Sequence, residues 1–330
     1  MSALLSVRDL RVEFATRRGP LVALDGVSFE IAPGEILGVV GESGAGKSLT
    51  GLAIINLLDP PGRIAGGEIR LDGARIDNLP PARMREIRGR RIGIIFQDPL
   101  TSLNPLLRIG DQLTETIRAH TSLTRRQARE RAVAWLGEVG IPSPEKRIDG
   151  YPHEFSGGMR QRVVIALALC AEPALVIADE PTTALDVSVQ AQIIAVLKNL
   201  TRRHGAAVML ITHDMGVIAE TADRVAVMYA GRIAEIGDVG RLVRNPLHPY
   251  TQGLMAAIPT LESRDRRLAQ IPGAMPRLSA IPRGCAFAPR CPKAFDRCVE
   301  RPPLLPVGDG SAACWLYWEH EAPVVAEVPR

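Results

Sequence analysis

One glycine-rich segment has the residue types and spacing that hold a polyphosphate. Residues 41–48 fit the pattern G-x-x-x-x-G-K-[S/T], between the apolar run 35–40 and the helix-compatible run 49–58. The glycines allow backbone N–H groups to converge on phosphate oxygens, while Lys47 would reach the β- and γ-phosphates and Ser48 would ligate Mg²⁺. The nucleotide-binding residues that we expect are Gly41, Glu42, Ser43, Gly44, Ala45, Gly46, Lys47, Ser48 and Leu49.

A pair of carboxylates follows a second apolar run. Residues 174–178 are continuously apolar and lead directly to Asp179 and Glu180. A buried strand that ends there places Asp179 where it can hold Mg²⁺, usually through water, and Glu180 where it can polarise an attacking water. For an isolated pair the alternative is an acidic helix cap before Pro181. That alternative does not account for the phosphate-binding segment found in the same chain.

These residues require a sheet whose strands end close together. Three continuous apolar runs, Ile36–Val40, Ala174–Ala178 and Ala207–Ile211, are typical of fully buried strands, and each is followed by a polar cluster. In open α/β sheets, chemistry gathers where such strands end. Near the N-terminus, residues 7–14 and 21–31 alternate in polarity and predict half-buried antiparallel strands, whereas residues 106–140 predict helices.

The composition is that of an ordinary folded chain. Of 330 residues, 46% are hydrophobic and 23% charged, which excludes a disordered or fibrous protein. The net charge of +4 is too small to indicate a nucleic-acid partner by itself. No apolar run reaches the roughly 18 residues of a membrane span. Residues 1–14 mix charges into their apolar stretch, so we expect a cytosolic chain without a signal peptide.

A second glycine-containing motif identifies a family. Ser156, Gly157, Gly158 and Met159 precede Asp179 by about 20 residues, Gln97 follows the apolar run 92–96, Asp186 follows Glu180 closely, and His213 follows the run 207–212. Over about residues 4–240 this order resembles the ATP-binding cassette (ABC) family. The resemblance implies an α/β P-loop NTPase, with a RecA-like core, an antiparallel β subdomain and an inserted helical subdomain at about residues 98–160.

The resemblance also implies a role for each of these residues. Glu180, His213 and Gln97 would be catalytic, and Ser48, Gln97 and Asp179 would hold Mg²⁺. The helix that begins at Ser156-Gly157-Gly158-Met159 offers a second anion-binding N-terminus. In the family it meets the ATP of a partner subunit, in a head-to-tail dimer with Asp186 at the interface. Phe14 would stack on adenine, although an arginine of the 15–21 segment could do so and leave Phe14 in the core.

The C-terminal part narrows the family. Residues 245–251 (NPLHPYT) and 284–291 (GCAFAPRC) resemble the extension of oligopeptide/dipeptide importer ATPases, and the match is close to the D-type subunit of dipeptide permeases. We therefore expect a nucleotide-binding domain at 1–245 and the extension at 246–330. The expected function is ATP-driven uptake of di- or oligopeptides. Import of nickel or another small solute, or a soluble ABC ATPase acting on nucleic acid or ribosomes, are the alternatives.

The importer resemblance implies its partners and its location. These are a second homologous ATPase subunit or a second copy of the chain, two permease subunits and an extracytoplasmic binding protein, with no nucleic acid. The chain would lie peripherally on the cytoplasmic face of the inner membrane.

Four of the five cysteines gather near the C-terminus. Cys285, Cys291, Cys298 and Cys314 have the spacing C-x₅-C-x₆-C-x₁₅-C, without the C-x₂-C pairs of common zinc ribbons. For a chain without an export signal, a metal site is favoured over disulfides. Four thiolates suit Zn²⁺ or an iron–sulfur cluster, and the importer resemblance favours a [4Fe–4S] cluster. Zinc, or thiols without metal, remain the alternatives.

Overall fold

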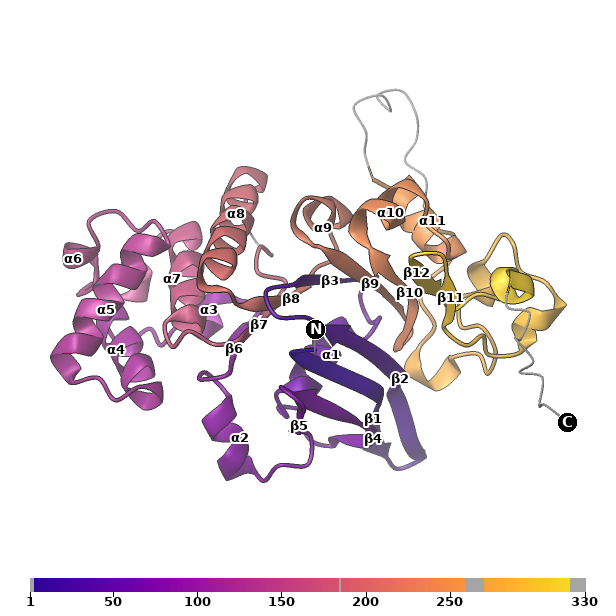
Figure 1. Ribbon diagram of the computed structural model, residues 1–330, viewed down its shortest axis with the longest axis horizontal. Helices are drawn as coiled ribbons and strands as arrows, with labels where there is room; N and C mark the ends of the chain where they lie inside the picture. Colours follow the sequence, from indigo (N-terminus) through magenta and orange to yellow (C-terminus); the bar gives the residue numbers. More distant parts are fainter. Residues whose placement is uncertain (1–2, 184, 259–269, 321–330) are drawn as a thin grey trace, which may run out of the picture.

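The centre of the molecule is an eight-stranded sheet (Figure 1). The computed structural model describes residues 3–183, 185–258 and 270–320. The strand order is β11-β12-β10-β9-β3-β8-β7-β6, and β9, β3, β8, β7 and β6 run parallel. The bounds are β3 (Ile36–Val40), β6 (Ile92–Ile95), β7 (Leu175–Asp179), β8 (Ala207–Ile211), β9 (Arg224–Tyr229), β10 (Arg232–Asp238), β11 (Leu305–Val307) and β12 (Gly310–Ala312).

The central strands are apolar throughout because both of their faces are covered. In β7, Val176 and Ala178 belong to the core beneath the helical block, whereas Leu175 and Ile177 belong to the core beneath the antiparallel sheet. Side chains of a strand alternate between its two faces, so burial of both faces requires an unbroken apolar run. The expected buried strands are therefore present, with residues 36–40 and 207–211 matching β3 and β8 in full.

A four-stranded antiparallel sheet lies to one side of the central sheet. Its order is β2-β1-β4-β5, formed by β1 (Leu5–Thr16), β2 (Gly19–Ile31), β4 (Gly62–Leu71) and β5 (Ala74–Arg75). Val7, Leu10 and Val12 face the core while Asp9 and Arg11 are exposed. One covered face and one wet face explain the polarity alternation in this part of the sequence.

A block of helices lies at the left end of the molecule in Figure 1, at the opposite end from the C-terminal extension. It consists of α3 (Pro99–Ser102), α4 (Ile109–His120), α5 (Arg125–Glu138), α6 (Pro144–Arg147) and α7 (Gly157–Leu169). A capping box starts α5, since Thr124 accepts from the Gln127 N–H while the Gln127 side chain accepts from the Thr124 N–H. The remaining α-helices are α1 (Lys47–Ile54), α2 (Pro81–Ile87), α8 (Val187–His204), α9 (Met215–Thr221), α10 (Val239–Arg244) and α11 (Pro249–Ala256).

The C-terminal extension adds two strands to the central sheet, which the sequence did not predict. β12 pairs antiparallel with β10, Glu235 lying opposite Ala312, and β11 pairs with β12. The described residues between α11 and β11 contain short 3₁₀ turns, in agreement with the little regular structure expected there. The chain becomes proline-rich near residue 245, yet residues beyond this point still contribute strands to the central sheet.

A buried carboxylate anchors the start of the extension. Glu235 in β10 is 0% exposed and accepts hydrogen bonds from the N–H groups of Leu247 and His248, at 2.9–3.1 Å. Arg241 of α10 donates to the same carboxylate at 2.7 Å. His248 in turn accepts the Tyr250 N–H at the start of α11, and burial lowers the pKa of His248 to about 4. The NPLHPYT motif thus has a structural role at this junction.

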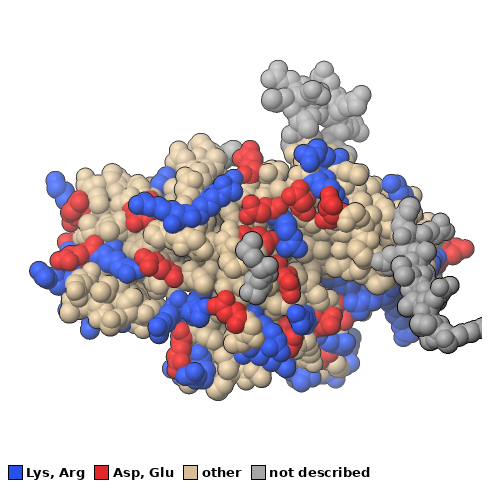
Figure 2. Space-filling model, in the orientation of Figure 1, with Lys and Arg blue, Asp and Glu red and all other residues tan. Residues whose placement is uncertain are grey.

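Charges of both signs are interspersed on the face shown in Figure 2, in keeping with the net charge of +4. Among the described residues, no helix has the length and apolar character needed to cross a membrane.

We predict that Glu235→Ala destabilises the folded chain by about 3 kcal/mol, because it leaves a buried guanidinium and buried N–H groups without their acceptor. Chemical denaturation measures the loss. Glu68→Ala is the matched control, since Glu68 is paired with Arg70 at the surface. Equal stability of the two variants would contradict the anchoring role.

Candidate active site

The phosphate-binding segment joins β3 to α1, as the sequence predicts. Gly41, Gly44 and Gly46 have φ values of 151°, 82° and 103°, a region that favours glycine. A Cβ on Gly41 would lie 2.3 Å from the backbone oxygen of Met228, so a larger residue cannot replace it without moving β9. The backbone is therefore folded into a tight loop whose N–H groups lead into the N-terminus of α1.

Lys47 is buried at the base of this loop. Its side chain donates to the carbonyl oxygens of Gly41 and Glu42 at 2.8 and 3.2 Å. Burial lowers its pKa, an effect that the negative charges of Glu180 and Asp179 oppose. The ammonium group is thus held inside the loop, where a polyphosphate would be bound.

Ser48 at the start of α1 meets Asp179 at the end of β7. The Ser48 hydroxyl donates to Asp179 Oδ1 at 2.9 Å. Burial raises the pKa of Asp179 and so does the charge of Glu180, whereas the Ser48 hydrogen bond and Lys47 lower it. A hydroxyl and a carboxylate at one point are the hard oxygen ligands that Mg²⁺ takes together with phosphates. The two residues fit the expected Mg²⁺ site.

Glu180 is surrounded by three polar side chains. Its Oε2 accepts from Gln97 at 3.2 Å and from Thr183 at 2.8 Å, and lies 3.4 Å from His213 Nδ1. Gln97, Glu180 and His213 come from the ends of β6, β7 and β8, so the parallel sheet brings the three expected residues together. Glu180 also has a φ of 46°, an uncommon conformation for a residue with a side chain. Such strain often occurs at functional sites.

The second glycine motif lies at the N-terminus of α7. Ser156 caps this helix, and its hydroxyl accepts the Met159 N–H at 3.4 Å. A Cβ on Gly158 would come 2.8 Å from Val189 of α8, which explains the need for glycine there. Within the described residues, no hydrogen bond or ion pair joins residues 156–159 to the phosphate-binding loop. One copy of the chain therefore does not bring the two motifs together by such contacts.

Two further expected residues lie apart from this cluster. Asp186 is exposed at the N-cap of α8. Phe14 is half-buried in β1, opposite Gly62 of β4, and packs against the core of that side of the molecule. Stacking of Phe14 on adenine stays a prediction.

Sequence reasoning missed three residues of this region. Thr183 holds Glu180, and its place three residues after the carboxylate was a usable signal. Tyr250 accepts the Glu42 N–H at 2.9 Å, and Arg290 binds the Glu42 carboxylate with both distances 3.0 Å. Both come from the extension, more than 200 residues further along the chain, and no local pattern connects them to the loop.

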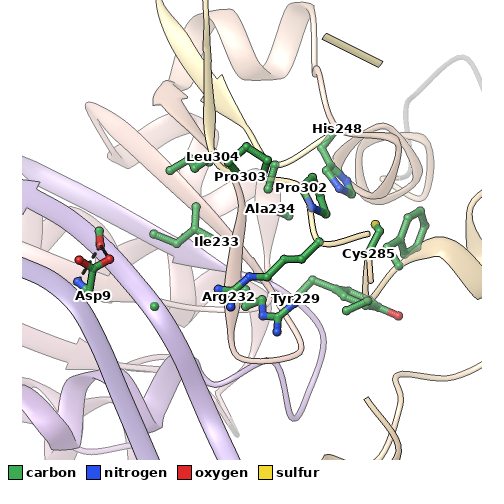
Figure 3. A pocket seen from close by; sticks show the side chains of 16 residues that line it. Asp9, Tyr229, Arg232, Ile233, Ala234, His248, Cys285, Pro302, Pro303 and Leu304 are labelled. Atoms are coloured by element: carbon green, nitrogen blue, oxygen red, sulfur yellow. Dashed lines mark hydrogen bonds between the residues drawn. The ribbon is translucent and has the colours of Figure 1, made fainter. Parts of the chain in front are cut away.

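A separate cavity of about 270 Å³ lies between the antiparallel sheet, β9–β10 and the extension (Figure 3). Its lining residues include Tyr229, His248 and Cys285 but none of the expected active-site residues. Arg232 and Arg301 also line it, and both are already paired with Asp25, at 2.6 and 3.0 Å. Because both guanidinium groups are already paired with Asp25, they do not indicate which ligand this cavity would bind.

The structure does not support the expected four-cysteine metal centre, or the description of the extension as a cysteine-rich metal module. Across the ranges 3–183, 185–258 and 270–320, no three His, Cys, Asp or Glu side chains are arranged to hold a metal ion. Burial, with smaller effects of neighbouring cysteines, raises the pKa of Cys285, Cys291 and Cys314, the last to about 11. Binding of a metal by these thiols would have to displace their protons. Strand pairing and ion pairs join the described part of the extension to the cassette.

The loop, the buried lysine and the carboxylates at neighbouring strand ends define a P-loop nucleotide-binding protein of the ATP-binding cassette type. The ABC transporter family model matches residues 24–183, and the model of the oligopeptide/dipeptide transporter C-terminal region matches residues 234–298. The chain belongs to the ABC transporter family, among the ATP-binding proteins of oligopeptide transport.

Curated relatives cover nearly the whole chain. The oligopeptide transport ATP-binding protein OppD of Bacillus subtilis is 50% identical over 94% of this chain and 87% of its own length. OppD of Salmonella typhimurium is 49% identical over 92% and 90%. AppD of Bacillus subtilis, also an oligopeptide transport ATP-binding protein, is 46% identical over 98% and 99%.

Solved structures share the cassette fold. The dimeric post-hydrolysis structure of the ATP-binding cassette MJ0796, bound to ADP and Pi, is 26% identical, with a TM-score of 0.64, and covers 71% of this chain and 98% of that chain. The cbiO1 protein of Clostridium perfringens is 28% identical, with the same TM-score of 0.64, and covers 74% and 92%.

We predict that Glu180→Gln lowers ATP turnover by about 10²- to 10³-fold while MgATP binding is retained, because the amide keeps the shape but cannot accept a proton from water. Phosphate release and nucleotide binding are measured on the same preparations. Glu172→Gln is the control, since that exposed glutamate pairs with Arg131 away from the site. Near-normal turnover of Glu180→Gln would exclude the role of general base.

Proposed function

We propose that the chain is the ATP-hydrolysing motor subunit of an importer of di- or oligopeptides. The single observation that carries the proposal is the meeting of Ser48, Asp179 and Glu180 beside the buried Lys47. This arrangement serves both halves of the reaction, binding of MgATP and activation of water. The match of the extension to the transporter C-terminal region, and the curated relatives, support the peptide substrate.

Each residue of the site has a defined part in this reaction. The N–H groups of residues 41–48 and the Lys47 ammonium bind the phosphates, and Ser48 and Asp179 hold Mg²⁺. When bound, Mg²⁺ neutralises charge that develops on the phosphate oxygens. Glu180 accepts the proton of the attacking water, held in orientation by Thr183. Gln97 and His213 flank the same carboxylate and orient the water toward the γ-phosphate.

Hydrolysis requires a second subunit in this proposal. The N-terminus of α7 offers Ser156, Gly157, Gly158 and Met159 to an anion, yet no hydrogen bond in the described chain joins these residues to its own phosphate-binding loop. A head-to-tail dimer supplies them from the partner, with Asp186 exposed at the interface. A homologous subunit or a second copy of this chain would serve. The dimeric form of the related cassette MJ0796 supports such an arrangement.

The helical subdomain, at about residues 98–160, carries the permease contact in this proposal. A groove there is lined by residues of the 101–107 segment, α4 and Leu167. Beside it lie two exposed apolar side chains, Leu106 at 83% and Leu107 at 39% exposure. A groove lined by both polar and apolar side chains, with an exposed leucine beside it, suits a short amphipathic helix from a membrane subunit.

The remaining partners follow from the importer function. Two permease subunits would place the chain peripherally on the cytoplasmic face of the inner membrane. An extracytoplasmic binding protein would deliver the solute. Nickel or another small solute, carried by the same machinery, is the alternative that the test must separate from peptide.

The test is reconstitution of the full chain with its permeases in vesicles. We expect ATP-dependent uptake of labelled peptide, competed by other peptides and not by nickel ions. The isolated chain should hydrolyse ATP slowly, with a rate per subunit that rises with concentration. Full hydrolysis by a monomer, or uptake of nickel without peptide, would contradict the proposal.

We predict that Leu106→Asp abolishes co-purification with the permeases and leaves MgATP affinity unchanged, because a carboxylate cannot be buried in an apolar contact. Affinity purification from membranes measures the association. Val299→Asp is the matched control, since Val299 is a 77% exposed apolar side chain of the extension. Equal retention of permeases by both variants would place the contact elsewhere.

We further propose that the four cysteines of the extension take up a [4Fe–4S] cluster, with Zn²⁺ as the alternative. What supports this is their proximity: the charges of the other three thiols all raise the pKa of Cys314. A metal that replaces the protons removes this repulsion and supplies folding free energy.

Anaerobic purification should then yield iron, sulfide and a broad absorption near about 400 nm. We expect Cys291→Ser to lose the metal and Cys170→Ser, the control in the buried end of α7, to keep it. Stoichiometric zinc would replace the cluster by the alternative. A folded extension without iron or zinc would exclude both.

A further inference from the structure

One residue of the phosphate-binding loop is held from three directions. The Glu42 carbonyl accepts from Lys47 at 3.2 Å, its N–H donates to the Tyr250 hydroxyl at 2.9 Å, and its carboxylate binds Arg290. The last two contacts come from the extension and not from the cassette. The extension therefore reaches the loop that binds the phosphates.

Several contacts other than Glu42 hold Arg290 in place. Its side chain is 7% exposed and donates to the carbonyl oxygen of Pro272 at 2.8 Å. Its guanidinium lies 5.9 Å from the ring centres of both Tyr229 and Phe287. A buried guanidinium with this many fixed contacts has little freedom to move, so it can set the position of the carboxylate that it binds.

Tyr250 is equally constrained. It is 0% exposed, in α11, and its ring lies 4.7 Å from that of Tyr229 and 5.3 Å from that of Phe287. Its N–H is bonded to His248, which the Glu235 carboxylate anchors to β10. Contacts through His248 and Glu235 therefore fix the position of the Tyr250 hydroxyl relative to the central sheet.

We propose that Arg290 and Tyr250 are positioning residues for nucleotide binding, acting through Glu42. Tyr250 fixes the backbone at the start of the loop. Arg290 neutralises a carboxylate that would otherwise repel the phosphates. The inference rests on the proposed function, since it requires that the loop binds MgATP.

The chain offers a matched control for this role. Arg301 also joins the extension to the cassette through an ion pair, with Asp25 of β2 at 3.0 Å, and its partner does not belong to the phosphate-binding loop. Arg290→Gln and Arg301→Gln each remove one such pair. If both arginines are purely structural, each variant can lower Tm but neither loses MgATP affinity. If Arg290 is a positioning residue, only Arg290→Gln loses affinity.

The experiment measures MgATP affinity by displacement of a fluorescent ATP analogue, and Tm without nucleotide, on the full chain. Arg290→Gln should weaken MgATP binding about tenfold, because the unpaired Glu42 carboxylate then repels the bound phosphates. Arg301→Gln should lower Tm only. Glu42→Gln combined with Arg290→Gln should restore most of the affinity, because no unpaired carboxylate is left. Tyr250→Phe should weaken binding about threefold through loss of one hydrogen bond.

Equal affinity of Arg290→Gln and the wild type, or no recovery in the double variant, would overturn the inference. If Arg290→Gln does not fold, wild-type affinity of Tyr250→Phe would overturn it. A wild-type chain that does not bind MgATP would exclude the proposed function itself. Failure of the proposed function is thus distinguishable from failure of the inference about Arg290 and Tyr250.

Discussion

The structure depends on five parallel strands that end at one edge. β6, β7, β8 and β3 deliver Gln97, Asp179–Glu180, His213 and the phosphate-binding loop to this edge. The central strands are buried on both faces, so their ends cannot shift independently. This common edge turns four segments, spread over more than 170 residues of sequence, into one site.

Charged side chains of both signs lie together at that edge of the sheet. Lys47 lies with Asp179 and Glu180 in partly buried surroundings, and burial shifts the pKa of the lysine down and that of Asp179 up. Burial therefore disfavours each charged form, and the opposite charges already present offset this only in part. A magnesium–nucleotide complex brings both signs at once, a cation for the carboxylates and phosphates for the lysine. Lys47 on one side and the carboxylates on the other therefore suit such a complex.

The sequence allowed prediction of whatever a local pattern determines. Lys47 and Ser48 follow from loop spacing, and Asp179 from the apolar strand before it. The hairpin β11–β12 could not be predicted, because three-residue strands that contain Pro306 carry no periodicity and their pairing with β10 is long-range. Arg290 is one of 40 basic residues, and nothing near it indicates a contact with Glu42. The cysteine spacing predicted a four-thiol metal site, whereas the described residues contain no group of three or more His, Cys, Asp or Glu that could hold a metal ion.

The hairpin also determines which surfaces of the sheet remain open. β10 is seven residues long, and without a neighbour its free N–H and C=O groups would invite pairing with another chain. β12 covers part of it, and β11, now outermost, is three residues long with a proline at its centre, which has no N–H to donate. At the opposite end β6 has four residues. Growth of the sheet from one molecule into the next is thereby discouraged at both ends.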